Sequence, residues 1–282
     1  MAARHASGPM ARRRGHDWPT AGLAVLALLA GLALGLPVLV LVARAIFGGA
    51  LLHVGELGVV LDGLALSLVT TAASLALTVL IGLPLAILLA RRSFRGSAVV
   101  EAIVDLPIVL PPSVAGLALL LLLGRRGLLG DPLEAIGMEI PFTTLAVVLA
   151  QTFVSAPFFI RSVRTGIASI ERDLEDAARV DGAAESRVLA AVTLPLASAA
   201  LAAGLVMSWA RSLGEFGATI MFAGNVEGRT QTLPLVVYGE FQAGNLDASI
   251  AAAAILVLAA FGVLVAVRTL RWGRALDLRS GA

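Results

Sequence analysis

The sequence predicts an all-α, polytopic membrane protein with six transmembrane helices and with both termini in the cytoplasm. Of its 282 residues, 59% are apolar and only 14% are charged, and the mean hydropathy is +0.94. A soluble domain carries about 25% charged residues. Six stretches without charge are each long enough, within a turn, to cross roughly 30 Å of hydrocarbon. The arginines fall mostly on one side of the resulting topology.

The six charge-free stretches are the expected transmembrane helices. They cover residues 18–43, 63–90, 106–124, 140–160, 188–210 and 248–267. Each is expected to be helical, because hydrocarbon offers no hydrogen-bond partner to an open backbone group. Glycine and proline inside them predict kinks, since neighbouring helices can satisfy the freed groups. These kink positions are Gly82, Pro84, Pro111, Pro112 and Pro157.

The first stretch has a second reading, as the apolar core of a secretory signal peptide. Such a core has about 7–15 residues, and this run is longer, so we expect a retained helix at 18–45 behind a flexible cytoplasmic tail at 1–17. The main membrane domain is expected at 62–268, with a cytoplasmic loop at 161–187. Residues 269–282 are expected to form a cytoplasmic tail.

The fifth stretch is expected to be broken. Residues 188–224 hold one possible ion pair and would span roughly 55 Å as a single helix, which is too long for one crossing. We expect a short interfacial piece, then the true span, then a break near Gly214 or Gly217. Arg211 and Glu215 stand four residues apart, so they can pair on a helix.

The distribution of arginine predicts the orientation. All 21 basic residues are arginine, and sixteen of them fall in segments that are cytoplasmic if the N-terminus is inside, while Arg211 lies within a span. This bias is typical of the positive-inside rule, and it places the 161–187 loop in the cytoplasm. The four expected outside are Arg44, Arg125, Arg126 and Arg229. Nothing in the sequence accounts for the adjacent Arg125 and Arg126.

The residue types present exclude several classes of protein. Without lysine the chain cannot form a P-loop, which needs Gly-x4-Gly-Lys-Ser/Thr, so it is not itself an ATPase. It has no cysteine, and its histidines, His5, His16 and His53, are scattered outside the apolar stretches. We therefore expect no catalytic residue, no metal site and no enzyme activity of its own. The pI of about 10.2 reflects the arginines of the topology, and no nucleic-acid partner is expected.

The loop after the fourth stretch predicts a compact knob. Residues 171–181 are charged and helix-forming, Gly182 permits a turn that a Cβ would resist, residues 183–192 form a second short helix, and Pro195 redirects the chain. Apolar members of the first helix lie close to one face: Leu174, Ala177, Ala178 and Val180. Such a knob can sit in a groove on a partner. Periodicity alone leaves an ordinary amphipathic surface loop equally open.

This loop resembles the cytoplasmic EAA loop of ABC-importer permeases, whose pattern is Glu-Ala-Ala, three residues, Gly, nine residues, Ile-x-Leu-Pro. Here Asp176-Ala177-Ala178 precedes Gly182 by the same spacing, and Val192-Thr193-Leu194-Pro195 follows after nine residues. The resemblance implies a type I ABC importer permease fold and docking on a separate ATPase subunit, which would use ATP and Mg; no cofactor is bound directly. The coupling residues that it implies are Glu175, Asp176, Ala177, Ala178, Gly182, Leu194 and Pro195.

The region after the fifth span resembles the molybdate permease branch of these importers, and the likeness covers roughly residues 60–268. Gly214-Glu215-Phe216-Gly217 is shared with the sulfate branch, whereas Gly224-Asn225 and the run from Arg229 to Pro234 look more like molybdate permeases. The resemblance implies import of molybdate or tungstate across the cell membrane, with sulfate or thiosulfate as the alternative. It also implies a homodimer with two ATPase subunits and one extracytoplasmic oxyanion-binding protein.

Polar groups inside the spans are candidates for the translocation pathway or gate: Gln151, Thr152, Ser155, Ser208, Arg211, Ser212 and Glu215. A divalent oxyanion is costly to desolvate, so we expect a weakly polar pathway and selection by the binding protein. The hydroxyl and amide groups are equally open as interhelical hydrogen bonds. Arg211 and Glu215 could pin a helix end, contact the anion or form a gate. A secondary transporter or channel would need more buried charge, and a membrane enzyme would need a catalytic set that is missing here.

Overall fold

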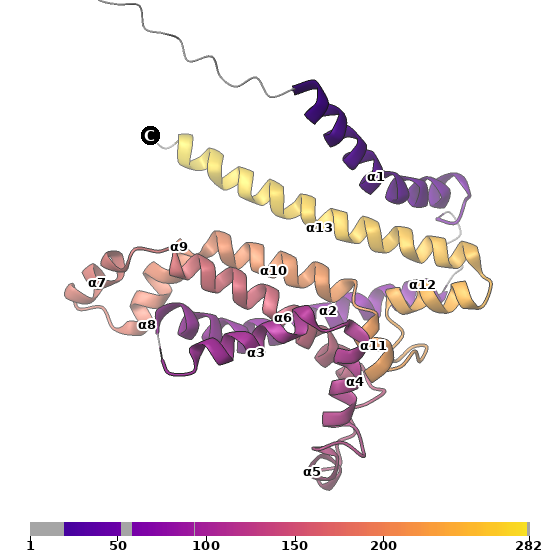
Figure 1. The fold of residues 1–282 in the computed structure, drawn as a ribbon, viewed down its shortest axis with the longest axis horizontal. Helices are drawn as coiled ribbons and strands as arrows, with labels where there is room; N and C mark the ends of the chain where they lie inside the picture. Colours follow the sequence, from indigo (N-terminus) through magenta and orange to yellow (C-terminus); the bar gives the residue numbers. More distant parts are fainter. Residues whose placement is uncertain (1–19, 52–57, 93, 281–282) are drawn as a thin grey trace, which may run out of the picture.

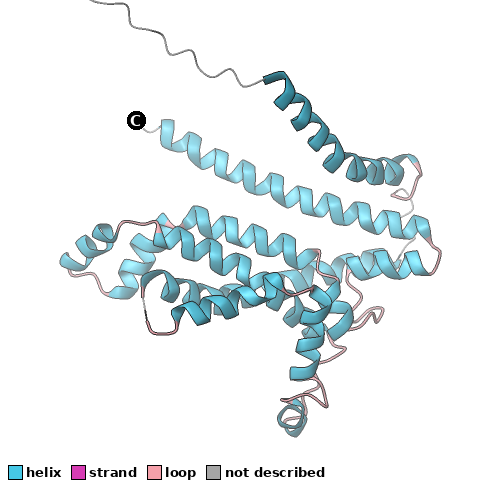
Figure 2. Cartoon of the chain, in the orientation of Figure 1, coloured by secondary structure: helices cyan, strands magenta, loops and turns pink. Residues whose placement is uncertain are grey.

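The computed structural model describes residues 20–51, 58–92 and 94–280, so the expected tail at 1–17 lies outside the described residues. Every regular element in these ranges is helical (Figure 2). Four helices are long and apolar enough to cross a membrane, and two further spans result if each of two bent helix pairs counts as one. The prediction of an all-α, polytopic membrane fold is confirmed.

The long helices run along the length of the molecule (Figure 1). They are α1 (Thr20–Phe47), α2 (Gly58–Arg91), α6 (Thr144–Ala168) and α13 (Leu246–Ser280). The first bent pair is α3 (Ser97–Val109) with α4 (Pro112–Leu123), and the second leads from α8 (Glu185–Val188) and α9 (Leu194–Leu196) into α10 (Ser198–Leu213). The short elements are α5 (Gly130–Ala135), α7 (Arg172–Val180), the π-turn Leu189–Thr193, α11 (Gly217–Phe222) and α12 (Leu233–Gln242).

The centre of the bundle is formed by α2, α6 and α10, which pack through small residues. A Cβ added at Gly82 of α2 would lie 3.0 Å from the Ile160 side chain of α6, and one added at Gly166 would lie 2.1 Å from the Ala200 side chain of α10. In a membrane, small residues at such contacts let backbones approach closely, because no hydrophobic driving force joins the helices. These glycines therefore set the spacing of the central bundle.

The stretch expected as one span at 106–124 is two helices that meet at 118°. Leu110 and Pro111 link them, with ψ angles of 135° and 133°. Each of these residues precedes a proline, and the residue before proline is driven out of the α conformation. Two such residues in succession break the helix, whereas the single prolines Pro84 and Pro157 stay inside α2 and α6.

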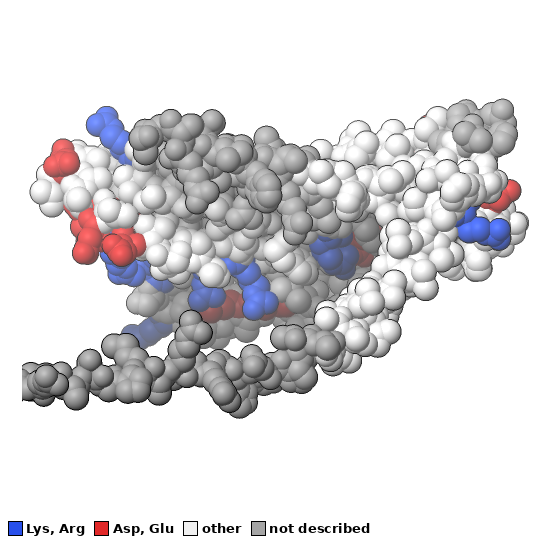
Figure 3. All heavy atoms as spheres, turned by 90° about the horizontal axis from the view of Figure 1, so that it is seen from above, with Lys and Arg blue, Asp and Glu red and all other residues white. Residues whose placement is uncertain are grey.

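The outer surface of the bundle is apolar. None of the apolar window of α1 is buried within the chain, and side chains along it, such as Leu34 at 79% exposure, face outwards. Most of the charged side chains visible in Figure 3 gather towards the end that carries α7, beyond a broad uncharged surface. Exposed apolar surface of this extent marks contact with lipid or with partner chains. In Figure 1, α4 and α5 project from one side of the bundle.

Candidate functional site

The loop between α6 and α10 folds into a knob, residues 171–196, at one end of the bundle (Figure 1). The helix α6 continues to Ala168, beyond the expected start of the loop at 161, and α10 begins only at Ser198. The preceding pieces meet α10 at 71°. The fifth stretch is therefore a short piece followed by a span that ends at Leu213, with Gly214 as its C-cap, as the sequence predicts.

Gly182 ends the first knob helix in a left-handed conformation, with φ of +86°. The N–H of Ala183 donates to the carbonyl of Ala178 at 3.0 Å, and the N–H of Gly182 donates to the carbonyl of Arg179 at 3.0 Å. This pair of bonds is a Schellman motif, which satisfies the last carbonyls of a helix and strongly favours glycine at this position. The spacing from Ala178 to Gly182 is thus the spacing that the turn requires.

Pro195 explains the second half of the motif. Proline has no N–H and its ring clashes with the carbonyl four residues earlier, so an ordinary α-helix cannot run through it undisturbed. The preceding residues, Leu189–Thr193, form a π-turn, and the N–H of Leu194 donates to the carbonyl of Leu189. Single-turn π segments are frequent at functional sites. Here the wider turn presents the hydroxyl of Thr193 to the first knob helix.

The two halves of the knob meet at the carboxylate of Glu175. Its Oε1 accepts from Thr193 Oγ1 at 2.7 Å and from Arg91 Nη2, at the end of α2, at 2.6 Å. Glu175 is only 4% exposed. The sequence placed Glu175 in the loop but did not identify Arg91 or Thr193 as its partners.

The opposite side of α7 is exposed. Asp176 and Ala177 lie on it beside two apolar side chains, Leu174 at 49% exposure and Val180 at 87%. An apolar centre with an acidic flank is a composition that suits a protein partner better than lipid. Ala178 and Leu194 are half-buried, and Gly182 and Pro195 are exposed.

Arg179 braces the knob internally. Its guanidinium lies 2.7 Å from Glu185 and 2.6 Å from Asp176. The hydrogen bond to Glu185, followed by that to Asp176, raises the pKa of Arg179, and the hydrogen bond from Arg179 lowers the pKa of Glu185. Because these groups are exposed, solvent screens their attraction. These ion pairs therefore contribute little to the stability of the chain, but they hold the two knob helices in a fixed arrangement.

Two further ion pairs join α6 to α3 at the same end. Arg164 lies 2.7 Å from Glu101, and Arg161 lies 3.6 Å from Asp105. Both pairs are partly exposed and neither touches the knob. They account for two of the arginines that the sequence assigned to the cytoplasmic loop.

The expected pathway hydroxyls lie inside the bundle, where they join its helices. Ser212 Oγ lies 3.2 Å from Ser74 Oγ, and Thr152 Oγ1 donates to Val148 O at 2.7 Å and lies 3.2 Å from Ser74 Oγ. The hydroxyl of Ser208 donates to the carbonyl of Ser155 at 2.8 Å. These contacts match the interhelical alternative for Thr152, Ser208 and Ser212. Their role in translocation stays a prediction.

Gln151 and Ser155 behave differently from these hydroxyls. Gln151 is 1% exposed and Ser155 is fully buried, yet neither amide atom of Gln151 nor the hydroxyl of Ser155 has a hydrogen-bond partner in the described chain. An unpaired buried polar group is costly, above all in a membrane. Their use as pathway groups also stays a prediction.

A buried row of hydroxyl residues on α2 was missed by the sequence analysis. The row consists of Ser67, Thr70, Thr71, Ser74 and Thr78, all fully buried. Their spacing of three and four residues follows one helix face. The spacing is visible in the sequence, but hydroxyl groups carry no charge and do not interrupt an apolar stretch.

Arg211 and Glu215 form the expected ion pair, with Nη1 and Oε2 2.5 Å apart. Glu215 is 1% exposed, and its Oε1 also accepts from the backbone N–H of Ala218 in the first turn of α11 at 2.7 Å. The carboxylate therefore ties the end of α10 to the start of α11. This geometry matches the alternative in which the pair pins a helix end, while contact with an anion or gating is untested.

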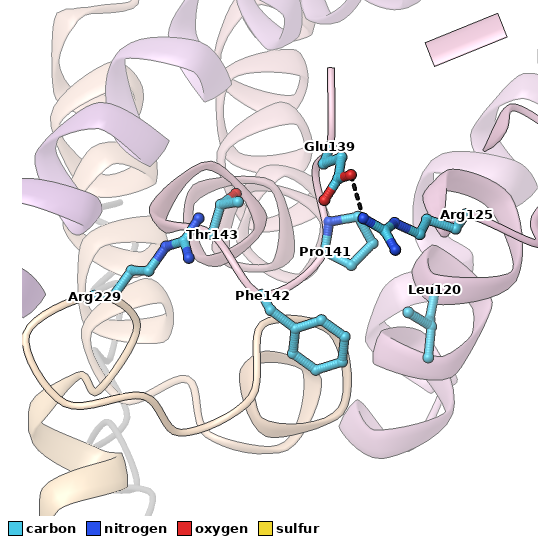
Figure 4. Close-up of a pocket in the computed structure, with 7 residues that line it drawn as sticks. All are labelled: Leu120, Arg125, Glu139, Pro141, Phe142, Thr143 and Arg229. Carbon is cyan, nitrogen blue, oxygen red and sulfur yellow. Dashed lines mark hydrogen bonds and ion pairs between the residues drawn. The ribbon is translucent and has the colours of Figure 1, made fainter. Parts of the chain in front are cut away.

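The end opposite the knob carries a cavity of about 310 Å³ (Figure 4). Arg125 and Arg229 reach it from different loops, and Arg125 pairs with Glu139. The pairing with Glu139 raises the pKa of Arg125. Phe142, which also lines the cavity, has a positive φ of 59°, and its backbone N–H donates to the carbonyl of Phe222. The ion pair gives Arg125 the local partner that the sequence did not reveal.

Within the described ranges, no three histidine, aspartate or glutamate side chains are placed to hold a metal ion. The prediction that the chain holds no metal is not tested by this observation.

Comparison with known proteins identifies the family. Residues 82–272 match the family described as "Binding-protein-dependent transport system inner membrane component". The chain is 46% identical to "Molybdenum transport system permease protein ModB" of Mycobacterium tuberculosis, over 72% of this chain and 77% of that protein. It is 39% identical to the protein of the same name from Escherichia coli strain K12, over 65% of this chain and 82% of that protein.

Solved structures support the fold. A bacterial ABC transporter involved in the import of alginate has a TM-score of 0.69 at 19% identity, covering 93% of this chain and 96% of its own. The inward-facing MetNI methionine ABC transporter has a TM-score of 0.59 at 21% identity, covering 77% of this chain and 96% of its own. The chain therefore belongs to the family of inner-membrane components of binding-protein-dependent transport systems, and its fold is that of an ABC importer transmembrane subunit.

Proposed function

We propose that this chain is the permease subunit of an ATP-driven importer that carries molybdate, or the similarly sized and charged tungstate, across the cytoplasmic membrane. The observation that carries the proposal is the 46% identity to a molybdenum transport permease over most of both chains. The assembly would contain two copies of this chain, two ATPase subunits that use ATP and Mg, and one extracytoplasmic oxyanion-binding protein.

The knob supplies the contact with the ATPase in this proposal. Its exposed face offers Leu174, Ala177 and Val180 for close packing and Asp176 for a basic partner. Complementary charge at the rim of an interface favours the correct partner and orientation. When ATP closes the two ATPase subunits, the two knobs would move together, and the cavity between the permease subunits would change from inward-facing to outward-facing.

The interior suits an anion that passes without being held. Apart from Arg91 at the knob end of α2, and from Arg211 and Glu215, which pair with one another, the buried polar groups of α2, α6 and α10 are uncharged. A strongly basic pathway would bind a divalent anion tightly and release it slowly. Selection would then rest with the binding protein, for which the arginines and exposed side chains around the cavity of Figure 4 offer a docking surface.

Two alternative functions can be distinguished from the proposed one by a single transport experiment. A sulfate or thiosulfate importer would share the architecture and differ in the anion. A secondary transporter or channel would transport without ATP, and the ion pair of Arg211 with Glu215 near the end of α10 gives it little support.

The experiment reconstitutes the chain in liposomes with a candidate ATPase subunit and a candidate oxyanion-binding protein. Uptake of radiolabelled molybdate is measured with and without ATP on the ATPase side. We expect uptake to require ATP and the binding protein, and to be inhibited by tungstate more strongly than by sulfate. Uptake that persists without ATP would contradict the proposal, and stronger inhibition by sulfate would favour the sulfate alternative.

A further inference from the structure

We propose that Glu175 is a positioning residue that holds the two halves of the knob together and fixes the knob to the end of α2, so that a movement of the knob reaches α2; this inference rests on the proposed function. Removing its charge is expected to uncouple ATP hydrolysis from transport while leaving the ATPase contact in place. The inference concerns the inner side of α7, which faces away from the partner.

The geometry places one carboxylate oxygen between two donors from different parts of the chain. Arg91, which donates at 2.6 Å, is the last residue of α2, and Thr193, which donates at 2.7 Å, is the last residue of the π-turn. Arg91 also donates to the carbonyl of Ile170, just before the knob, at 3.5 Å. Charge-assisted bonds of this kind are stronger and shorter than neutral ones.

The ion pair of Arg91 with Glu175 is more deeply buried than the other ion pairs at the same end of the bundle. The side chains of Arg91 and Glu175 are 16% and 5% exposed. The pairs of Arg179 with Asp176 and Glu185 are exposed, and they stay within the knob, as does the longer contact of 3.8 Å from Arg179 to Glu175. The pair of Arg164 with Glu101 joins α3 to α6. Among the ion pairs of the described residues, the one between Arg91 and Glu175 is the buried link from the knob to a central helix.

The backbone alone gives the knob a hinge. The chain turns by 71° where α9 meets α10, around Ala197, and it leaves α6 through the short link of Ser169 and Ile170. The bonds from Arg91 to Glu175 and to the carbonyl of Ile170 hold the knob against the end of α2, so that the knob and α2 move together. Because α2 packs on both α6 and α10, a knob that is fixed to Arg91 can move these three central helices as one body.

The test uses Glu175→Gln, which keeps the shape of the side chain and an acceptor for Thr193 but removes the charge that pairs with Arg91. Thr193→Val removes only the second donor and serves if Glu175→Gln does not fold. The matched control is Glu101→Gln, which removes a carboxylate that pairs at 2.7 Å at the same end without touching the knob.

The first measurement is uptake per ATP hydrolysed in the reconstituted complex. We expect Glu175→Gln to keep its affinity for the ATPase subunit while uptake per ATP falls by at least about fivefold, the lower end of typical coupling between sites. Thr193→Val should show a smaller fall, and Glu101→Gln should match the unmodified chain. Unchanged uptake per ATP in both Glu175→Gln and Thr193→Val would overturn the inference.

The second measurement does not depend on transport. Because the chain has no cysteine, spin labels can be attached at Leu88→Cys on the exposed face of α2 and at Arg172→Cys on α7, and the distance between the two labels can be measured. Chains that carry only one label identify the distances between two copies of the chain. We expect a narrow distance distribution that ATP does not change, and a broader one in the Glu175→Gln variant. Equal widths in the two would overturn the inference, and a complex without ATP-dependent uptake would contradict only the proposed function.

Discussion

Substitutions at Gly182 test whether the shape of the knob, rather than its composition, governs docking on the ATPase. Gly182 has φ of +86°, and a Cβ added there would meet no atom within 4 Å. A side chain therefore has room, and its cost lies in the backbone conformation alone. A substitution at this position therefore tests the effect of backbone strain without a steric clash.

The expected magnitude follows from the left-handed conformation. An L-residue with a Cβ pays about 1–2 kcal/mol there, whereas asparagine tolerates it better. A difference of this size changes a conformational equilibrium by roughly 5- to 30-fold. Gly182→Val should therefore lower the equilibrium constant for forming the native turn by about that factor, and Gly182→Asn should change it little.

The assay is the concentration of ATPase subunit that gives half-maximal binding-protein-stimulated hydrolysis in liposomes. We expect Gly182→Asn to remain close to the unmodified chain and Gly182→Val to need more ATPase subunit, by up to about 30-fold. Gly182→Trp adds bulk to the exposed knob as well as strain, so it should insert normally but abolish transport-linked hydrolysis. Normal stimulation by both Gly182→Val and Gly182→Trp would refute the reasoning.

Three further predictions concern the rest of the chain. Gly166→Leu should lower stability in detergent by about 1–3 kcal/mol through overpacking against Ala200, seen as a lower melting temperature, while Gly262→Leu, with no atom within 4 Å, should not. Ser74→Ala removes two interhelical contacts worth about 0.6 kcal/mol each, so it should lower the melting temperature slightly without affecting insertion. Arg229→Gln should weaken stimulation by the binding protein, and more so at low salt, because exposed charges are screened; an unchanged response would remove Arg229 from the docking surface.

Local rules account for the parts of the site that the sequence predicted. The turn at Gly182 depends on residues no more than five apart, from Ala178 to Ala183. The break after Leu213 and the ion pair of Arg211 with Glu215 are likewise local. Even the two prolines at 111 and 112 signal a kink, although its size, 118°, depends on the conformations of two successive residues.

Contacts between distant segments could not be predicted in the same way. Arg91 lies 84 residues before Glu175, and nothing in either local sequence names the other. The same holds for Ser74, which is 138 residues before Ser212. Helix periodicity tells which face is buried, but partner choice depends on how the helices pack, and that is a property of the whole bundle.

The knob constrains its residues more tightly than the interior does. This difference explains why the sequence indicates coupling to an ATPase more readily than it indicates which anion is transported. In the proposed function the knob must keep one shape to bind a separate ATPase subunit. Few other residue types could replace those that set this shape: Gly182 in the turn, Pro195 after the π-turn and Glu175 with its buried hydrogen bonds. The interior needs only to avoid holding a divalent anion. Many combinations of serine, threonine and small residues meet that requirement, so the polar groups there carry little information about which oxyanion passes.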